Sequence, residues 1–558
     1  MIVPVTDLLS FVFARQTQYD HDSPLYIDAD SPDLHLSSTQ AETLVRRLIS
    51  GLRAAGLKSG DVVLLCLGNS YIYAPLFLAT IGAGGVVCGA NPAYHFLELD
   101  HLVRQSKPRF LITANNSLPT VLDVCRGNLI TQDCVFLVDA SQRLPTDADL
   151  DRTKADGVVP RNSERTSVRL LNDLLVQGKS RWVTFSDEIA MKGTPAAYYT
   201  TSGTTGLPKL AVVSHYNLII QHLSLHDKQT LPHAVVRLAC LPFFHIFGAA
   251  WTFIAPIRYG QPVYIMPRFS MRDYAENIDK YAITETYMAP PMIHTLNKRA
   301  SLEPGFATLL SSLRYVGIGG APIDVAALRA LRSNLDPLAT VTQVWGMTEF
   351  GPATLFRYGE NDDTGSVGRL LPGYAPKIVP VGTSVSTDTE APLHEGAGDL
   401  YIHTSALMDG YRGIPMSRDA RAWFYTGDIA YVANGKLYLV GRSKEMIKVR
   451  GWQVAPAELE AVIMQLKNVA DCAVVGVTTI DGLEETPRAY VVSKDQGKNQ
   501  AKLEVEIHGA VQEQLASYKR LGGGIIFVAN IPRTASGKIQ RFRLQEGKRD
   551  VEHPGDIS

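Results

Sequence analysis

The 558-residue sequence lacks an excess of charge of either sign. Its 54 Lys and Arg residues nearly balance 55 Asp and Glu residues, and the formal net charge is −1. Proteins that bind nucleic acids normally carry a basic excess on the binding domain. The balance therefore argues against nucleic acid as the main partner, although a local basic site for a small phosphate compound remains compatible with it.

Cysteine is also scarce. The six cysteines stand at positions 66, 88, 125, 134, 240 and 472, with no C-x-x-C pair and no spacing typical of a metal site. Scattered cysteines of this kind favour free thiols in a reducing compartment over a disulfide framework.

Long hydrophobic runs are missing. The longest apolar stretch, 74–90, is interrupted by glycines and falls short of the roughly 18 uninterrupted residues that a membrane span needs. The N-terminus shows no basic region followed by an apolar run, and the last residues, Asp556-Ile557-Ser558, are not a peroxisomal S-K-L signal. We expect no transmembrane segment and a cytoplasmic location.

The pattern of apolar residues predicts an α/β protein. A helix is expected over 39–56, where Thr39 and Glu42 have the spacing of a capping box. Continuous apolar strands then alternate with helices, first between residues 62 and 90 and again between 262 and 345. Such alternation favours parallel sheets that are covered by helices on both faces.

The pattern of expected secondary structure changes twice towards the C-terminus. Short strands and turns dominate 366–440, as in a β-rich subdomain, and a compact α+β unit follows from about residue 443. We therefore expect an N-terminal domain of residues 1–441 and a smaller C-terminal domain of residues 442–558.

A loop rich in hydroxyl groups follows a predicted strand at 198–209. Its glycines allow a tight turn that presents backbone N–H groups to anionic oxygens, while its hydroxyl side chains add donors and its lysine adds a positive charge. The residues concerned are Thr201, Ser202, Gly203, Thr204, Thr205, Gly206 and Lys209. The glycine spacing is not that of a Walker A loop. A polyphosphate site fits this composition, and a flexible surface loop is the alternative.

The order of these residues resembles the phosphate-binding signature of the adenylate-forming superfamily, in which acyl-CoA synthetases and 4-coumarate-CoA ligases match best. The family signature usually continues with glycine where this chain has Leu210. The resemblance implies an enzyme that uses ATP and Mg²⁺ to convert a carboxylic acid into an acyl-adenylate. It then passes the acyl group to coenzyme A, and a mobile C-terminal lid takes part.

Further motifs of the family follow in order. Residues 343–349 resemble its aromatic-Gly-Met-Thr-Glu motif, and residues 317–322 resemble the turn that lies along the adenine. By resemblance, an aromatic ring stacks on adenine, a threonine reaches the α-phosphate and a glutamate holds Mg²⁺. The residues implied in nucleotide binding here are Gly320, Ala321, Gln343, Trp345, Gly346, Thr348 and Glu349.

The C-terminal third supplies the rest of the expected nucleotide site. Asp428 and Arg442 resemble the ribose-binding pair, Lys444 lies at the hinge, and Lys448 and Gln453 assist around the adenylate. Lys538 matches the family's catalytic lysine, which bridges the attacking carboxylate and the α-phosphate. The same resemblance assigns three residues to CoA binding: Arg268, Arg450 and Gly451.

The acyl pocket is expected around the segment 241–251. By resemblance, its lining consists of Phe247, Trp251, Met288, Ala289, Ile318, Gly319 and Val344, and His245 acts as a gate beside the acyl group. The large apolar side chains predict a hydrophobic acid without a polar tail, and Val344, which stands where relatives often have glycine, narrows the pocket. A carrier protein as acceptor, a luciferase-like oxygenation and a non-enzymatic binding protein are the alternatives.

Overall fold

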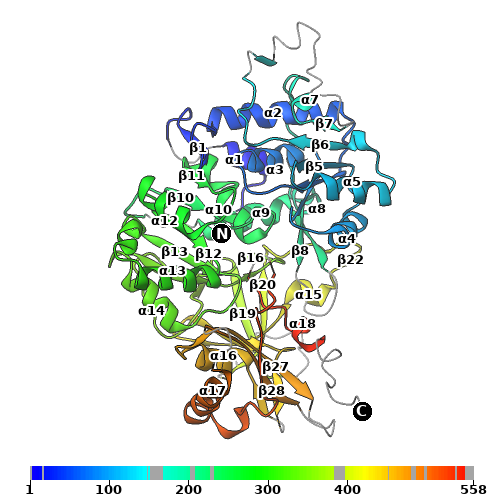
Figure 1. The fold of residues 1–558 in the computed structure, drawn as a ribbon. Coiled ribbons are helices and arrows are strands. Elements are labelled where there is room, and N and C mark those ends of the chain that lie inside the picture. The colour runs from blue at the N-terminus through cyan, green and yellow to red at the C-terminus, as the bar shows by residue number, and fades with distance from the viewer. Residues whose placement is uncertain are drawn as a thin grey trace, which may run out of the picture.

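The computed structural model describes most of the chain, and Figure 1 shows its ribbon. The described residues are 3–14, 18–146, 149–150, 168–201, 208–226, 231–381, 396–449, 452–478, 485–494, 499–534 and 537–546. Much of the hydroxyl-rich loop at 198–209 therefore lies outside the description. In the described part, no helix is long and apolar enough to cross a membrane.

A nine-stranded sheet forms one half of the N-terminal body. Its order is β22-β21-β9-β8-β4-β3-β5-β6-β7, and β4, β3, β5, β6 and β7 run parallel. The bounds are β3 (Val62–Cys66), β4 (Val86–Ala90), β5 (Phe110–Ala114), β6 (Val135–Val138), β7 (Arg169–Leu170), β8 (Pro195–Thr201), β9 (Lys209–Ser214), β21 (Gly410–Tyr411) and β22 (Ile414–Pro415). Every residue of β3 and β4 is buried, as expected for parallel strands covered on both faces.

A seven-stranded sheet, order β14-β13-β12-β10-β11-β1-β2, forms the other half. Its strands from β14 to β1 are parallel, so their carboxyl ends meet at one edge. The bounds are β1 (Pro24–Asp28), β2 (His35–Ser37), β10 (Arg237–Ala239), β11 (Val263–Ile265), β12 (Glu285–Met288), β13 (Tyr315–Gly319) and β14 (Thr340–Val344). Ligands of open α/β sheets bind outside such carboxyl ends.

The helices of the body cover these sheets. They are α1 (Leu8–Phe13), α2 (Ser38–Ala54), α3 (Tyr73–Gly82), α4 (Phe96–Ser106), α5 (Leu118–Gly127), α7 (Asn172–Leu175), α8 (Glu188–Gly193), α9 (His215–Leu225), α10 (Ile246–Thr252), α11 (Ala255–Tyr259), α12 (Met271–Lys280), α13 (Pro290–Leu302) and α14 (Val325–Ser333). The expected capping box of α2 is wrong by two residues. Ser37 is the N-cap, and it exchanges hydrogen bonds with Gln40 instead of Thr39 pairing with Glu42.

The β-rich subdomain is a four-stranded antiparallel sheet, order β19-β20-β23-β24, that lies below the two large sheets in Figure 1. Its bounds are β19 (Tyr374–Val379), β20 (Gly398–Thr404), β23 (Phe424–Ala433) and β24 (Lys436–Arg442), with α15 (Arg418–Ala422) beside it. Two short pairs lead into it: β15 (Gly346–Met347) with β16 (Gly351–Pro352), and β17 (Thr354–Leu355) with β18 (Arg369–Leu370).

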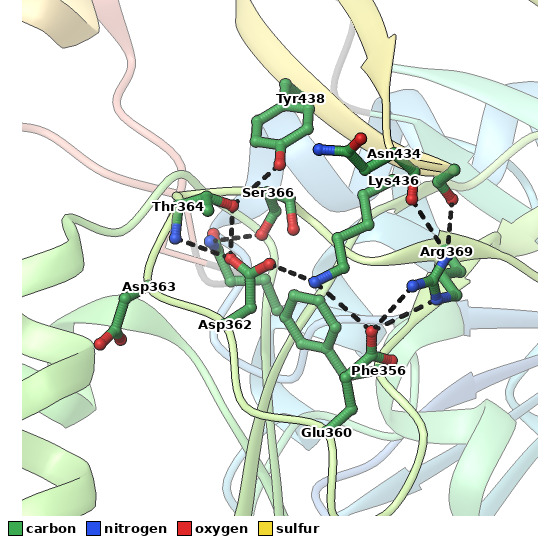
Figure 2. A network of polar contacts seen from close by, with 12 residues as sticks. Phe356, Glu360, Asp362, Asp363, Thr364, Ser366, Arg369, Asn434, Lys436 and Tyr438 are labelled. Carbon is green, nitrogen blue, oxygen red and sulfur yellow. Dashed lines mark hydrogen bonds and ion pairs between the residues drawn. The ribbon is translucent and has the colours of Figure 1, made fainter.

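A network of charged and hydroxyl side chains ties the 356–369 segment to this subdomain (Figure 2). Lys436 Nζ lies 2.5 Å from Asp362 Oδ2 and 3.4 Å from Glu360 Oε1, and Arg369 reaches Glu360 at 3.2 Å. Only 2% of the Asp362 side chain is exposed, and the Lys436 ammonium helps to hold the pKa of this carboxyl below its usual value. The network fixes the 356–369 segment on the turn between β23 and β24.

The C-terminal unit packs below the subdomain (Figure 1). It contains the pair β25 (Ile447–Val449) and β26 (Trp452–Val454), then a sheet of β27 (Val469–Thr478), β28 (Glu485–Ser493) and β29 (Ile525–Phe527). Its helices are α16 (Pro456–Met464), α17 (Gln500–Gln514) and α18 (Arg541–Glu546). A core of its own, formed by α16, α17 and the three-stranded sheet, includes Leu459, Val474 and Ile507.

Candidate active site

Lys538, on the loop between β29 and α18, enters the body of the protein. Its pKa is lowered by burial and by the Arg442 guanidinium, while the carboxylates of Glu349 and Asp428 act in the opposite direction. The loop rests on the body, because a Cβ placed on Gly537 would lie 3.5 Å from Cδ of Pro291. The structure thus brings together four charged residues that the sequence placed in one site.

Asp428 and Arg442 are direct cross-strand partners on β23 and β24. Arg442 Nε lies 2.7 Å from Asp428 Oδ1, and the Trp345 indole N–H donates to Asp428 Oδ2 at 3.0 Å. Burial raises the pKa of Asp428, against the opposing effects of Arg442 and Trp345. The aspartate is therefore held in one orientation, with its two oxygens bound by two fixed donors.

Glu349 is buried and held by a residue that the sequence analysis did not identify. The Tyr411 hydroxyl donates to Glu349 Oε1 at 2.7 Å. Tyr411 pairs with Ala211 between β21 and β9, and its ring lies 5.1 Å from Lys209 Nζ. This pairing links the end of the phosphate loop to Glu349. Thr201, at the start of that loop, is buried, whereas Ser202, Gly203, Thr204, Thr205 and Gly206 lie outside the described residues.

The remaining nucleotide candidates lie around the carboxyl ends of β13 and β14. Gln343 is buried at β14, and its side-chain amide donates to the Ser366 carbonyl at 3.0 Å. Gly320 follows β13 with a φ of 95°, in the left-handed region that favours glycine, and Ala321 comes next. Thr348 is buried next to Glu349, and Gly346 opens β15. These residues therefore follow the two strands where a ligand of this sheet would bind.

His245 caps the N-terminus of α10. Its Nδ1 accepts a hydrogen bond from the backbone N–H of Phe247 at 3.2 Å, so the neutral ring carries its proton on Nε2. Burial, with a contribution from Lys538, lowers the pKa of His245 to about 4. His245 is thus a neutral hydrogen-bond donor between the Lys538 loop and the aromatic residues of α10.

The aromatic residues of α10 pack against Tyr287 of β12. The rings of Trp251 and Tyr287 lie 3.8 Å apart with an interplanar angle of 12°, and Phe247 meets both rings edge-on. Tyr315 and Val344 complete the buried cluster. We call this set the aromatic wall: Phe247, Trp251, Tyr287, Tyr315 and Val344.

Two glycines of β13 make room for the aromatic wall. A Cβ on Gly317 would lie 2.4 Å from the Tyr287 ring, and one on Gly319 would lie 2.8 Å from the Phe247 ring. Ile318, between them, points to the opposite face and packs in a core with Met288 and Ile293. Gly319 thus lies at the aromatic wall as expected, while the side chains of Ile318 and Met288 lie away from it.

Tyr287 was not predicted from the sequence as a wall residue. The signal was available, because 284–289 reads as a strand and its alternation places Glu285 and Tyr287 on one face. The sequence alone did not indicate which of the two faces meets Trp251.

The expected CoA and hinge residues that the structure describes are exposed. Lys444 and Lys448 are exposed, the latter on β25, and Arg268 is exposed just before α12. Arg450, Gly451 and the side chain of Gln453 lie outside what the structure describes. Among the described candidates, Lys444, Lys448 and Arg268 thus face solvent in this arrangement.

Comparison with known proteins gives matches over nearly the whole chain. The sequence model of the family described as AMP-binding enzyme matches residues 13–412, and that of the AMP-binding enzyme C-terminal domain matches residues 458–538. The chain is 40% identical to the nicotinic acid-CoA ligase olcI of Penicillium canescens, over 96% of this chain and 97% of that protein.

Two further proteins illustrate the range of relatives. The chain is 39% identical to the phenylacetyl-CoA ligase epaB of Aspergillus niger, over 98% of both sequences. Its fold is similar to that of the anthranilate CoA ligase AuaEII in complex with anthranoyl-AMP, with a TM-score of 0.80, 23% identity and 98% of each chain covered. Both large sheets and the C-terminal unit are thus common to this chain and solved structures.

Proposed function

The chain belongs to the family of AMP-binding enzymes and is an ATP-dependent acyl-CoA ligase, and we propose that it activates a compact aromatic carboxylic acid with a single ring. The observation that carries this proposal is the stack of Trp251 on Tyr287, which closes the expected acyl pocket with two flat surfaces. Flat aromatic walls favour a flat ring, which can stack on them or meet them edge-on.

The size of the pocket supports a compact acid. Val344 and Trp251 are both nearly fully buried, and each fills space that a longer acid would need. The cavity beside the stack, lined by Trp251, Tyr287 and Gly248 among others, has a volume of about 10 Å³. That is about the space of one water molecule. No part of an acid therefore fits behind the aromatic wall, so the wall marks the end of the pocket.

The names of the relatives point in the same direction. One is a nicotinic acid-CoA ligase and another a phenylacetyl-CoA ligase, both named for acids with one six-membered ring. The flat surfaces of the aromatic wall and these names both favour an acid with a single ring, and they leave the ring substituents open.

We assign the first half-reaction to the charged cluster. Lys538 would contact the attacking carboxylate and the α-phosphate, where negative charge builds up in the transition state. Asp428 would accept hydrogen bonds from the ribose hydroxyls, while Arg442 holds that aspartate and faces the same ribose. His245 would donate from Nε2 beside the acyl group, since its low pKa keeps it neutral.

Glu349 fits the requirement of a magnesium ligand. Mg²⁺ in ATP-dependent enzymes is usually bound by one or two carboxylates together with substrate phosphates. Glu349 is a buried carboxylate with one oxygen held by Tyr411, next to the Thr348 hydroxyl and linked through Tyr411 to Lys209. The ion would neutralise phosphate charge, and Glu349 and Thr348 would hold it.

The second half-reaction needs a rearrangement, in which the CoA thiol attacks the acyl carbon and AMP leaves. We propose that the lid, residues 442–558, turns at Lys444 and brings Lys448 and Gln453 towards the adenylate in place of Lys538. Arg268, Arg450 and Gly451 would then contact CoA. The exposure of Lys444 and Lys448 in the present arrangement is compatible with this role.

The cytoplasmic location also stays a prediction.

The decisive experiment measures pyrophosphate release from ATP and Mg²⁺ with benzoate, nicotinate, phenylacetate, 4-coumarate and octanoate, with and without CoA. We expect multiple turnovers and a thioester only with CoA, and the highest kcat/KM with single-ring acids. Higher activity with 4-coumarate or octanoate would refute the compact pocket. Turnover without thioester formation would instead favour another acceptor.

A further inference from the structure

The loop that carries Lys538 is a tight turn, and its described residues are bonded to one another. Arg533 and Ile539 form an antiparallel bridge across it. The backbone N–H of Thr534 donates to the Lys538 carbonyl at 2.8 Å, and the Lys538 N–H donates to Thr534 Oγ1 at 3.1 Å. These bonds lie within the loop. They fix its shape, whereas its position relative to the rest of the lid requires a contact outside it.

Arg533 makes such a contact with the sheet of the lid. Its Nη2 lies 2.8 Å from Asp471 Oδ1 and its Nε lies 3.3 Å from Asp471 Oδ2, so the guanidinium binds both carboxylate oxygens of this residue of β27. Its Nη1 donates to the carbonyl of Gly537, directly before Lys538, at 3.0 Å. Because the guanidinium is planar and its donors are fixed relative to one another, these three bonds set the position of the Gly537 peptide relative to β27.

This ion pair lies where the lid meets the body. The Gly537 turn approaches Pro291 at the start of α13, and His294 stands one turn further along the same helix. Burial lowers the pKa of His294, and the charges of Asp471 and Arg533 act on it in opposite directions. The two lid residues are therefore close to the helix against which the loop rests.

We propose that Arg533 is a positioning residue of the first half-reaction, which holds Lys538 in place for the carboxylate and the α-phosphate. The ion pair with Asp471 fixes the guanidinium, and the guanidinium fixes the peptide that precedes Lys538. Its effect on the reaction passes through the lysine. This inference rests on the proposed function, since it requires that Lys538 acts in adenylation, but it does not depend on which acid is activated.

The two half-reactions distinguish positioning from a general role in folding. Adenylation is followed as exchange of pyrophosphate into ATP with the most active acid of the panel above, and thioester formation is started from the synthetic adenylate of that acid and CoA. Arg533→Ala should lower kcat for adenylation about 30-fold and leave the KM for ATP within about twofold, because only the lysine is displaced. Thioester formation should stay within about twofold of the rate of the unchanged enzyme.

Two further variants sharpen the comparison. Arg533→Lys keeps the positive charge but cannot bind both Asp471 oxygens and the Gly537 carbonyl at once, so it should restore only part of the adenylation rate. Lys519→Ala is the matched control, because it removes the cation of another partly exposed ion pair in the lid, the one with Glu458. It should leave the rates of both half-reactions unchanged.

A double variant tests whether Arg533 acts through the lysine. When Lys538→Ala is already present, Arg533→Ala should cause no further loss of adenylation, because the group that it positions is gone. A further loss as large as in the single variant would overturn the inference.

The remaining outcomes separate this inference from the proposed function. Equal losses of both half-reactions in Arg533→Ala would make the ion pair a structural element of the lid and overturn the positioning role. Adenylation within about threefold of the normal rate would overturn it as well. Normal adenylation by Lys538→Ala would instead refute the role assigned to the lysine itself, and the inference would fall with it.

Discussion

The nucleotide site and the aromatic wall lie at the same sheet edge, but they differ in whether their buried polar groups have hydrogen-bond partners. In the nucleotide site each charged group has a fixed partner: Asp428 has Arg442 and Trp345, and Glu349 has Tyr411. The indole N–H of Trp251, in the aromatic wall, and the ring nitrogens of His222, on the neighbouring helix α9, have none among the described residues. The protein itself completes the hydrogen bonds of the nucleotide site, whereas it leaves these buried groups unpaired among the described residues.

The largest expected effect is a loss of stability at low pH, which comes from two buried histidines beside the aromatic wall. Burial lowers the pKa of His222 well below 6.5 and that of His226 to about 3. Both are neutral in the folded protein, so their contribution to stability is full above pH 6.5 and is lost as the pH falls from there. At pH 5 His226 should cost roughly 2 kcal/mol of unfolding free energy relative to pH 8, and His222 should add to this loss. Urea denaturation at the two pH values measures this loss.

The variant His222→Phe isolates one of these contributions. A phenylalanine keeps the ring contacts with Phe11 and Tyr259 and cannot take up a proton. The difference in unfolding free energy between pH 8 and pH 5 should become smaller. An unchanged difference would show that His222 is not a source of the acid sensitivity.

The next largest effect is expected from a change in the nucleotide site. Lys538→Ala removes the positive charge that lies near Glu349, Asp428 and Arg442. Adenylation, followed as acid-dependent exchange of pyrophosphate into ATP, should fall on the order of 10²–10³-fold, since one transition-state contact is lost. Lys502→Ala, on an exposed face of α17, is the control and should exchange at the normal rate. A loss of less than tenfold would contradict the assigned role.

A smaller effect is expected from Asp428→Asn. The amide cannot pair with Arg442 as a carboxylate does, so kcat/KM for ATP should fall on the order of 30-fold, mostly through a higher KM. Asp362→Asn is the matched control, because it makes the same change in the buried ion pair with Lys436 shown in Figure 2. That variant should lower the Tm and leave the KM for ATP unchanged. A raised KM in both variants would mean that the Asp428 effect is structural.

The same contrast explains what the sequence could and could not predict. Asp428, Arg442, Glu349 and Lys538 stand in short motifs, and the structure brings all four together although they are far apart along the chain. Trp251 also stood out as a large apolar side chain. Its partner Tyr287 did not, because the face of β12 that meets α10 depends on how two distant segments pack. Tyr411 was missed for the same reason, since its pairing with β9 spans about half of the body.

Val344→Gly tests the smallest difference, the depth of the aromatic wall. Val344 packs in one cluster with Trp251 and Tyr287, and its Cγ2 lies 3.4 Å from the Cβ position of Gly317. Its removal opens space beside Tyr287, so the ratio of kcat/KM for 4-coumarate over benzoate should rise about tenfold.

The control for this change is Val341→Gly, on the same strand but facing the core of Met288 and Ile318. Both variants lose a β-branched residue from β14 and should lose similar stability, yet only Val344→Gly should change the ratio of the two acids. If Val341→Gly raised the ratio equally, the effect would come from a loosened strand and the wall would not set the length of the acid. If neither variant changed the ratio of kcat/KM for the two acids, Val344 would not limit the length of the acid. The limit would then be set by the stacked rings of Trp251 and Tyr287.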